Sequence, residues 1–384
     1  MEENREYNRR PLDIAFAVIM TITIIFGTYF AVKMIQVKYF SDDSTAKLPS
    51  QSYYYSKLDT TQQDAYNALK KEINDMPKFI LLPDGMDIDS VNMVIETFRA
   101  DNSFSAFIAV DKMSFVDSYF IDGLKVTYTM SKDEYEKIEN TLNSKIESIV
   151  SSVPEGLDDF EKEVYLHDYL IENTDYEINN KPLSNTVCGA LIDKKSACVG
   201  YAQAMKMLLN AVGIDCITVC GEADDGTRQE NHMYNQVKIE GEWYNLDPTW
   251  DDAVGEYPTL THKFFNLTDK DLSKTHKAYI DVNECNAVSN NYFVKKGLLF
   301  DSYNEECKDK IFKEIAKSTD SAPAEIRFSS EEEYQKACQK LVAEDIFLGQ
   351  DKIKALNSKQ IDIENTGIIR CDSLNIVEFK VSYK

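Results

Sequence analysis

The longest run of apolar positions lies near the N-terminus and predicts a helix that crosses a membrane. Nineteen residues, 14–32, carry no charge. At a rise of 1.5 Å per residue they span about 29 Å, close to the ~30 Å hydrocarbon core of a bilayer. A cleavable signal peptide has a shorter apolar region of about 7–15 residues and a small-residue cleavage pattern, which this sequence lacks. We therefore expect an uncleaved membrane anchor over residues 12–35.

Charges around this segment indicate its orientation. Three arginines precede the apolar run and two lysines follow it, which favours a cytoplasmic N-terminus and a body outside the cytoplasm. The whole chain has 65 acidic and 42 basic residues, a net charge of −23. Proteins that bind nucleic acids or anionic membrane surfaces need a basic footprint instead. The composition therefore excludes nucleic acid as a partner, and we expect membrane contact through the N-terminal helix alone.

Beyond the anchor, helical and strand-like patterns alternate irregularly. Periodic apolar positions predict helices over 61–76, 89–100, 131–150, 158–173, 196–212, 308–317 and 330–342. Alternating or short apolar runs predict strands over 79–82, 105–110, 124–130, 215–220, 232–239, 242–247, 292–300, 324–328 and 374–383. Because no regular βαβ repeat appears, we predict an α+β fold. The predicted parts are a cytoplasmic N-terminus (1–11), a transmembrane helix (12–35), a juxtamembrane linker (36–59), an accessory α+β region (60–153), a central domain (154–282) and a C-terminal α+β domain (283–384).

One cysteine occupies a position that favours a reactive thiolate. Cys198 lies in the first turn of the predicted helix 196–212, for which Ser196 is the expected cap. Free N–H groups and the positive end of the helix dipole stabilise a thiolate there. The same N–H groups can bind the oxyanion that forms when sulfur attacks a carbonyl. Taken alone, a cysteine at this position is more often a small buried residue than a nucleophile.

A predicted hairpin supplies the partners that such a cysteine needs. If the turn Glu240-Gly241 pairs position 239 with position 242, Tyr234 faces Asp247 and His232 is its diagonal neighbour. Pro248 favours an extended conformation at Asp247. An imidazole and a carboxylate can bridge this diagonal, and the carboxylate would fix the tautomer of a histidine that takes a proton from a thiol.

These motifs together resemble the transglutaminase-like superfamily. The resemblance covers about residues 155–282 and rests on four elements in order, including C-x-G-Y-A, L-L-x-x-x-G-I and H-x-x-N-x-V-x-I-x-G-x-W-Y-x-x-D-P-T-W-D-D. It implies a papain-like α+β core with Cys198 as nucleophile, His232 as general base and acid, and Asp247 as the orienting residue. The segment 164–180 also resembles bacterial membrane- or wall-associated members. Where many relatives have His-Ala-Trp-Asn, this chain has Tyr234 in place of the tryptophan.

Further expectations concern the substrate groove and metals. We expect the aromatic side chains near the three catalytic candidates to line the groove; these are Tyr201, Tyr234, Trp243 and Trp250. We expect no cofactor and no metal, because His262 and His276 stand apart from any cysteine pattern and no C-x-x-C occurs. His167, beside Asp168 on a predicted helix, is expected to be structural.

The sequence therefore predicts a membrane-anchored extracytoplasmic cysteine enzyme of amide bonds. A Cys–His–Asp triad would act through a thioester on a peptide, a protein or a cell-wall peptide, with hydrolysis placed ahead of transamidation. The alternative is a non-catalytic cell-surface binding module on the same fold. The intact triad argues against it, because repurposed modules usually have a degenerate one.

Overall fold

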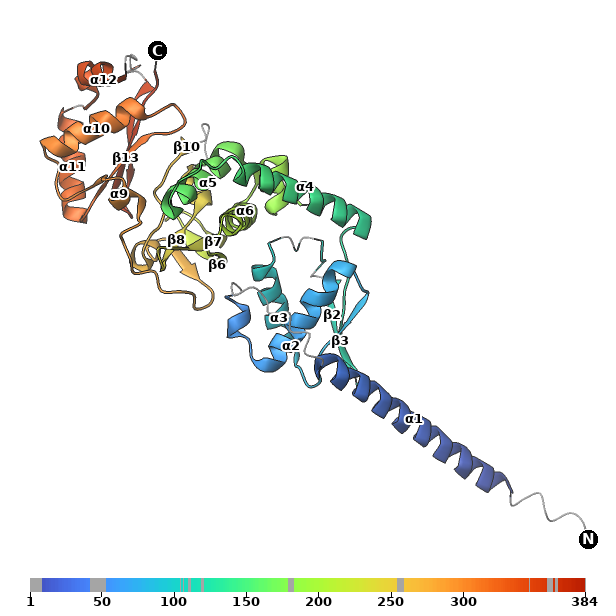
Figure 1. Cartoon of the computed structure of the whole chain (residues 1–384). Helices are drawn as coiled ribbons and strands as arrows, with labels where there is room; N and C mark the ends of the chain where they lie inside the picture. The colour runs from blue at the N-terminus through green and yellow to red at the C-terminus, as the bar shows by residue number, and fades with distance from the viewer. Residues whose placement is uncertain are drawn as a thin grey trace, which may run out of the picture. The chain divides into compact units, whose positions relative to one another are not determined.

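The computed structural model describes most of the chain. The described residues are 9–41, 53–103, 105, 107–109, 112–118, 121–178, 183–253, 259–344, 346–357, 362 and 365–383. Two compact units, 1–135 and 136–384, make up the chain (Figure 1).

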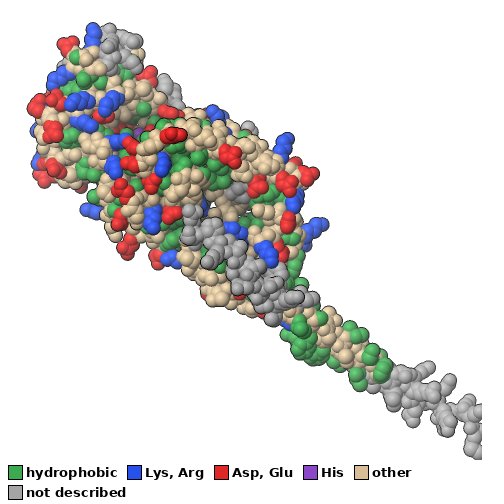
Figure 2. Space-filling model, viewed as in Figure 1, with side chains coloured by type: hydrophobic (Ala, Val, Ile, Leu, Met, Phe, Trp, Pro, Cys, Tyr) green, Lys and Arg blue, Asp and Glu red, His purple; other side chains and the backbone are tan. Residues whose placement is uncertain are grey.

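The first element is one long apolar helix, α1 (Arg9–Ser41). Its segment Phe16–Met34 is long and apolar enough to cross a membrane, and Figure 2 shows hydrophobic side chains exposed along the helix. Three threonine hydroxyls donate to backbone carbonyls four residues earlier, at 2.7–2.9 Å. Each hydroxyl is therefore satisfied inside the helix, as an apolar surrounding requires. The predicted apolar run 14–32 lies within α1.

The rest of the first unit packs helices on a small antiparallel sheet. Its strand order is β1-β3-β2, and the cores of its helices and strands meet in one apolar cluster. Asp59 caps the first of these helices in a capping box with Gln62. Asp87 caps the next helix. The elements are η1 (Tyr55–Lys57), α2 (Thr60–Glu72), η2 (Ile73–Asp75), β1 (Phe79–Leu81), α3 (Ile88–Asp101), β2 (Ser114–Asp117) and β3 (Asp122–Lys125).

Two predicted strands of this unit differ from the structure. Among the described residues of 105–110, the predicted strand appears as a single bridge from Ile108 to Tyr128. The alternating run 124–130 enters the sheet only at its start, where β3 ends at Lys125. Ser131 and Glu134 exchange the hydrogen bonds of a capping box at the start of α4 (Lys132–Val150).

A helix packed on a twisted antiparallel sheet forms the centre of the second unit. The strand order is β11-β6-β7-β8; α6 packs on β6 and β7, and α5 packs on α6 (Figure 1). The predicted register is confirmed, because Ile239 pairs with Glu242. Glu240 and Gly241 both have positive φ, 53° and 88°, as a type I′ turn requires. The elements are α5 (Asp159–Asn173), β4 (Asp175–Tyr176), η4 (Gly189–Asp193), β5 (Lys195–Ser196), α6 (Cys198–Ala211), β6 (Cys216–Asp224), β7 (Gln229–Ile239), β8 (Glu242–Leu246), α7 (Pro248–Asp251), β9 (Asp252–Ala253), β10 (Thr259–Leu260), α8 (Asp269–Leu272) and β11 (His276–Ala278).

A second sheet, with strand order β12-β13-β15-β14, ends the chain. The predicted strand 292–300 was wrong in its first half, which forms a helical turn that buries Phe293. Gly297, at φ 64°, ends this turn and only then does a strand begin. Short apolar runs carry too little periodicity to separate these two outcomes. The elements are α9 (Tyr292–Lys295), β12 (Leu299–Phe300), α10 (Glu305–Lys317), β13 (Ala324–Phe328), α11 (Glu331–Glu344), η5 (Ile346–Gly349), α12 (Gln350–Asn357), β14 (Gly367–Cys371) and β15 (Ile376–Lys380).

Close packing at the start of α6 generates a prediction for Gly200. A Cβ atom there would overlap the Ser196 hydroxyl and the Thr186 carbonyl. We expect Gly200→Ala to lower the free energy of unfolding by about 1–3 kcal/mol, the usual cost of overpacking. Gly367→Ala is the matched control, because a Cβ on Gly367 meets nothing within 4 Å. Equal shifts of the thermal unfolding midpoint in both variants would contradict this account.

Candidate active site

Cys198 is the first residue of α6, so its predicted place in the first turn is confirmed. The predicted cap was wrong: Ala197 is the cap residue, with extended backbone. The Ser196 hydroxyl instead donates to the Ser184 carbonyl at 2.8 Å. This bond fixes the segment that enters the helix. The thiol is partly exposed, unlike most of the other cysteines of this unit.

The hairpin brings His232 and Asp247 together as its register predicts. His232 lies in the first half of β7 and Asp247 follows β8 directly, and Nε2 of His232 is 2.7 Å from Oδ2 of Asp247. Both side chains are almost completely buried, at 2% and 0% exposure. Water therefore competes little for this hydrogen bond. His232 also interacts with the Cys198 side chain, so the three predicted residues meet.

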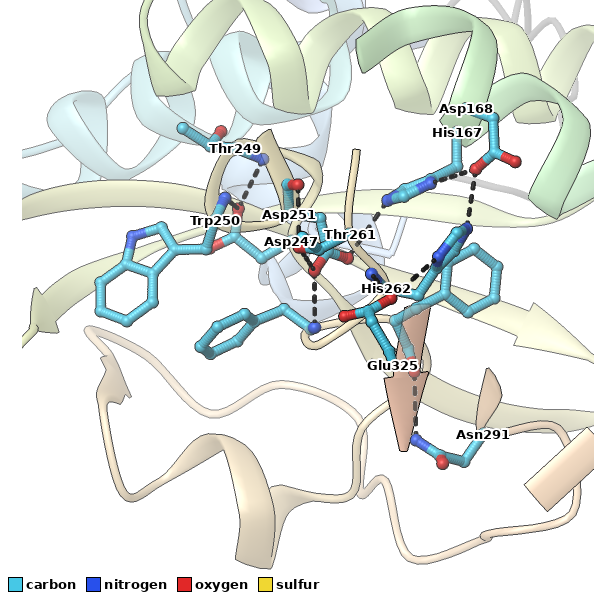
Figure 3. A network of polar contacts seen from close by, with 12 residues as sticks. His167, Asp168, Asp247, Thr249, Trp250, Asp251, Thr261, His262, Asn291 and Glu325 are labelled. Carbon is cyan, nitrogen blue, oxygen red and sulfur yellow. Dashed lines mark hydrogen bonds and ion pairs between the residues drawn. The ribbon is translucent and has the colours of Figure 1, made fainter. Parts of the chain in front are cut away.

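The Asp247 carboxylate receives four donors. Oδ2 accepts from Nε2 of His232 and, at 3.0 Å, from Nε2 of His276. Oδ1 accepts the backbone N–H groups of Thr249 at 3.0 Å and Trp250 at 3.2 Å (Figure 3). Asp247 thereby caps the short helix α7. Its side chain is held in one orientation by the backbone and by two imidazoles at once.

These contacts decide the charge of the pair. Burial alone would raise the pKa of Asp247, but the His232 and His276 imidazoles outweigh it and hold that pKa well below its usual range. Burial alone would lower the pKa of His232, whereas the Asp247 carboxylate and the Cys198 side chain raise it to about 10. At neutral pH the site therefore holds a carboxylate against an imidazolium.

His276 is the site residue that the sequence did not reveal. It begins β11, which pairs with β6 so that His276 lies opposite Ala223. Nδ1 of His276 is 2.8 Å from the Thr275 hydroxyl, and its ring lies 4.5 Å from the Trp250 ring. No local motif marks this position, because only the pairing of two distant strands brings it to Asp247. His276 contacts the carboxylate that orients His232, which makes it a candidate positioning residue.

Of the four predicted groove residues, the structure contradicts two. Tyr201 is completely buried and its hydroxyl donates to the Thr174 carbonyl at 2.7 Å. Tyr234, 3% exposed, packs against the His276 ring. Both side chains therefore belong to the core of the second unit and line no groove. Trp243 and Trp250 are half-buried, and the Trp250 ring lies 6.1 Å from the ring of His232.

A family model and several known proteins are similar to parts of this chain. Residues 147–248 match the family model of the Transglutaminase-like superfamily. Kyphoscoliosis peptidase of Mus musculus and of Homo sapiens are each 31% identical over 93 residues, which cover 22% of this chain and 14% of those proteins. The chain thus matches only about one seventh of the length of these curated relatives. Two solved structures are also similar, with little sequence identity. They are a TGase (14% identity, TM-score 0.27, 51% of this chain and 59% of that one) and a candidate cysteine protease from Cytophaga hutchinsonii (10%, 0.25, 36% and 61%).

The chain therefore carries a transglutaminase-like domain. Members of this superfamily are usually cysteine peptidases or acyltransferases. The match ends at residue 248, one residue beyond Asp247.

The electrostatics of the site generate a prediction for His232. We expect its imidazolium to persist at pH 8 and to titrate near pH 10, because Asp247 and Cys198 favour the charged form. Since this pKa lies above the unfolded value of about 6.5, the pairing contributes stability that is complete below pH 6.5 and lost as the pH rises through about 10. Histidine-selective labelling and NMR titration would measure it, and four histidines make assignment by single substitution practical.

Cys198→Ser tests the role of sulfur in that titration. We expect the pKa of His232 to fall in this variant, since the interaction with Cys198 is removed while the Asp247 contact stays. Cys220→Ser, at an exposed position on β6, is the matched control and should leave the titration unchanged. A neutral His232 at pH 8 in the unsubstituted protein would contradict the assignment.

Proposed function

We propose that this protein is a cysteine enzyme of amide bonds with Cys198 as nucleophile, His232 as general acid and base, and Asp247 as the orienting residue. The observation that carries the proposal is the buried 2.7 Å contact between His232 and Asp247, formed where His232 also meets Cys198 at the start of α6. Cysteine peptidases and acyltransferases need this combination of nucleophile, base and orienting group. The transglutaminase-like match supports the same class of chemistry.

The proposed first step forms a thioester. The Cys198 thiolate attacks the amide carbonyl carbon, and N–H groups at the start of α6 stabilise the resulting oxyanion. Nε2 of His232 is bound to Asp247, which leaves Nδ1 as the nitrogen for proton transfer. The imidazolium gives its proton to the leaving amine, the C–N bond breaks, and the acyl group stays on sulfur. Asp247 keeps the ring in place during both transfers.

The second step decides between the two activities. Water, deprotonated by neutral His232, releases a carboxylic acid and restores the thiol, which is hydrolysis. An amine such as a lysine side chain would instead form a new amide, which is transamidation. We place hydrolysis first, since the curated relatives are named peptidases. A peptide, a protein or a cell-wall peptide is the substrate class proposed.

We also propose that α1 anchors the enzyme in a membrane with the body outside the cytoplasm. The length and composition of Phe16–Met34 support the span. The three arginines before it and two lysines after it support the orientation. The acidic and basic side chains mixed on the visible face of the body in Figure 2 suit a water-exposed surface.

Residue-resolved alkylation at pH 6 tests the catalytic proposal. A thiol with the ordinary pKa of about 8.5 is almost wholly protonated at that pH and alkylates slowly. We expect Cys198, paired with the His232 imidazolium, to react at least about tenfold faster than Cys220, which is the more exposed of the two. Mass spectrometry of the full chain in detergent would give the rate for each cysteine.

Two variants complete this experiment. His232→Ala should remove the advantage of Cys198 and leave the rate of Cys220 unchanged. Ala223→Ser, at the position opposite His276 in the register, would show whether a small change near the site has the same effect without touching the triad. If Cys198 reacts no faster than Cys220, the triad is idle and a surface binding module becomes the better account.

A further inference from the structure

A second cluster of histidines and carboxylates lies beyond the far end of α7. Asp168 is at its centre, with Oδ1 located 2.9 Å from Nδ1 of His167 and 2.9 Å from Nε2 of His262 (Figure 3). His167 and Asp168 come from α5, whereas His262 follows β10. Both imidazoles are buried, and the Asp168 side chain is 29% exposed. Nothing in the proposed catalytic steps uses this cluster.

In each imidazole, the nitrogen that does not contact Asp168 (the outer nitrogen) faces another buried carboxylate. Nε2 of His167 is 3.2 Å from Oδ2 of Asp251, and Nδ1 of His262 is 3.4 Å from Oε2 of Glu325. Each ring therefore points one nitrogen at Asp168 and the other at a carboxylate behind it. Histidines that bind metals commonly have this arrangement, in which an outer carboxylate fixes the tautomer and orientation of the ring.

The outer carboxylates and rings are themselves fixed. Oδ1 of Asp251 accepts the backbone N–H of Phe264 at 2.8 Å. Oε2 of Glu325 accepts the backbone N–H of His262 at 3.0 Å, and the Tyr292 ring stacks on the His262 ring at 3.8 Å. The other oxygen of Glu325, Oε1, is buried without a hydrogen-bond partner in the described part of the chain.

We propose that this cluster is a site for a divalent metal ion, with zinc as the ion that its donors fit best. The ligands would be Nδ1 of His167, Oδ1 of Asp168 and Nε2 of His262, which lie within 4.8 Å of one another. Two imidazoles and one carboxylate are an ordinary zinc set. Ligand atoms on tetrahedral zinc lie about 3.3 Å apart, so the present contacts need to open by only about 0.4 Å. The exposed side of Asp168 leaves room for water as fourth ligand.

The catalytic cluster fits a metal less well, although it has the same composition. His232, Asp247 and His276 also bring three donor atoms within 4.8 Å of one another. There the carboxylate already accepts two backbone N–H groups besides the two imidazoles. The outer nitrogen of His276 faces a hydroxyl, that of Thr275, in place of a carboxylate. The outer carboxylates therefore distinguish the Asp168 cluster.

Metal at the Asp168 cluster would tie the central domain to the C-terminal sheet. His262 lies 94 residues from Asp168 and 63 residues from Glu325 along the chain, and Glu325 belongs to β13. An ion bound by Asp168 and His262 would fix the His262 ring, which Glu325 contacts through its other nitrogen. This gives the C-terminal sheet a structural role that the catalytic proposal does not need.

Zinc binding by the full chain tests this inference. The protein, purified in detergent without a histidine tag and stripped with a chelator, would be dialysed against Zn²⁺ and analysed for bound metal. We expect about one equivalent to remain per chain, and Co²⁺ in its place to give the strong visible absorption of tetrahedral coordination. His262→Gln and Asp168→Asn should each weaken binding by about tenfold or more. Asp168→Asn keeps the size of a partly exposed side chain, which protects the test against misfolding.

His276→Gln is the matched control in the catalytic cluster and should keep the bound zinc. Zinc should also raise the thermal unfolding midpoint of the unsubstituted chain, and not that of Asp168→Asn. The inference is overturned if the unsubstituted chain retains no zinc, or if zinc survives both substitutions at the Asp168 cluster. Loss of zinc in His276→Gln alone would likewise overturn it and place the ion at the catalytic cluster.

Discussion

The site depends on one buried carboxylate. Asp247 lies fully inside the second unit, where an ion without partners would be costly, and four donors surround it. Two of these are backbone N–H groups that α7 provides because Asp247 is its cap. The backbone alone therefore orients the carboxylate, independently of the two imidazoles. The His232 ring is oriented by a group that cannot rotate away, which is what a general base needs.

The single turn of α7 connects the two polar clusters. Asp247 precedes it and Asp251 ends it, and the two carboxylates hold different histidines, His232 and His167. Asp251 also accepts the backbone N–H of Phe264, in the segment after β10. This hydrogen bond fixes the segment against the end of α7. The two carboxylates are therefore separated by a single helical turn, and each is held by hydrogen bonds to a different histidine.

The sequence could predict what local geometry determines. A two-residue turn with two positive φ values fixes the register of β7 and β8, and this register alone places His232 beside Asp247. Helical periodicity also places Cys198 in the first turn of α6. The predicted cap was wrong because the Ser196 hydroxyl donates to the distant Ser184 carbonyl and does not cap the helix. Ala197 occupies the cap position instead. The burial of Tyr201 could not be predicted from its local sequence. Its hydroxyl donates to the Thr174 carbonyl, which lies 27 residues earlier in the chain.

Long-range pairing explains why the remaining polar residues could not be found. His276 reaches Asp247 only because β11 joins the sheet at β6, and no pattern near residue 276 states its neighbour. His262 belongs to no cysteine pattern in the sequence, and it is therefore not expected to bind a metal. Its partners are instead a carboxylate on α5 and one on β13. A scan for cysteine-based motifs is blind to such a set, since histidine and carboxylate donors assembled from separate elements leave no fixed spacing. The feature that identifies such a set is the burial of its acidic side chains. Burial can be recognised only from the fold, because it depends on contacts between distant parts of the chain.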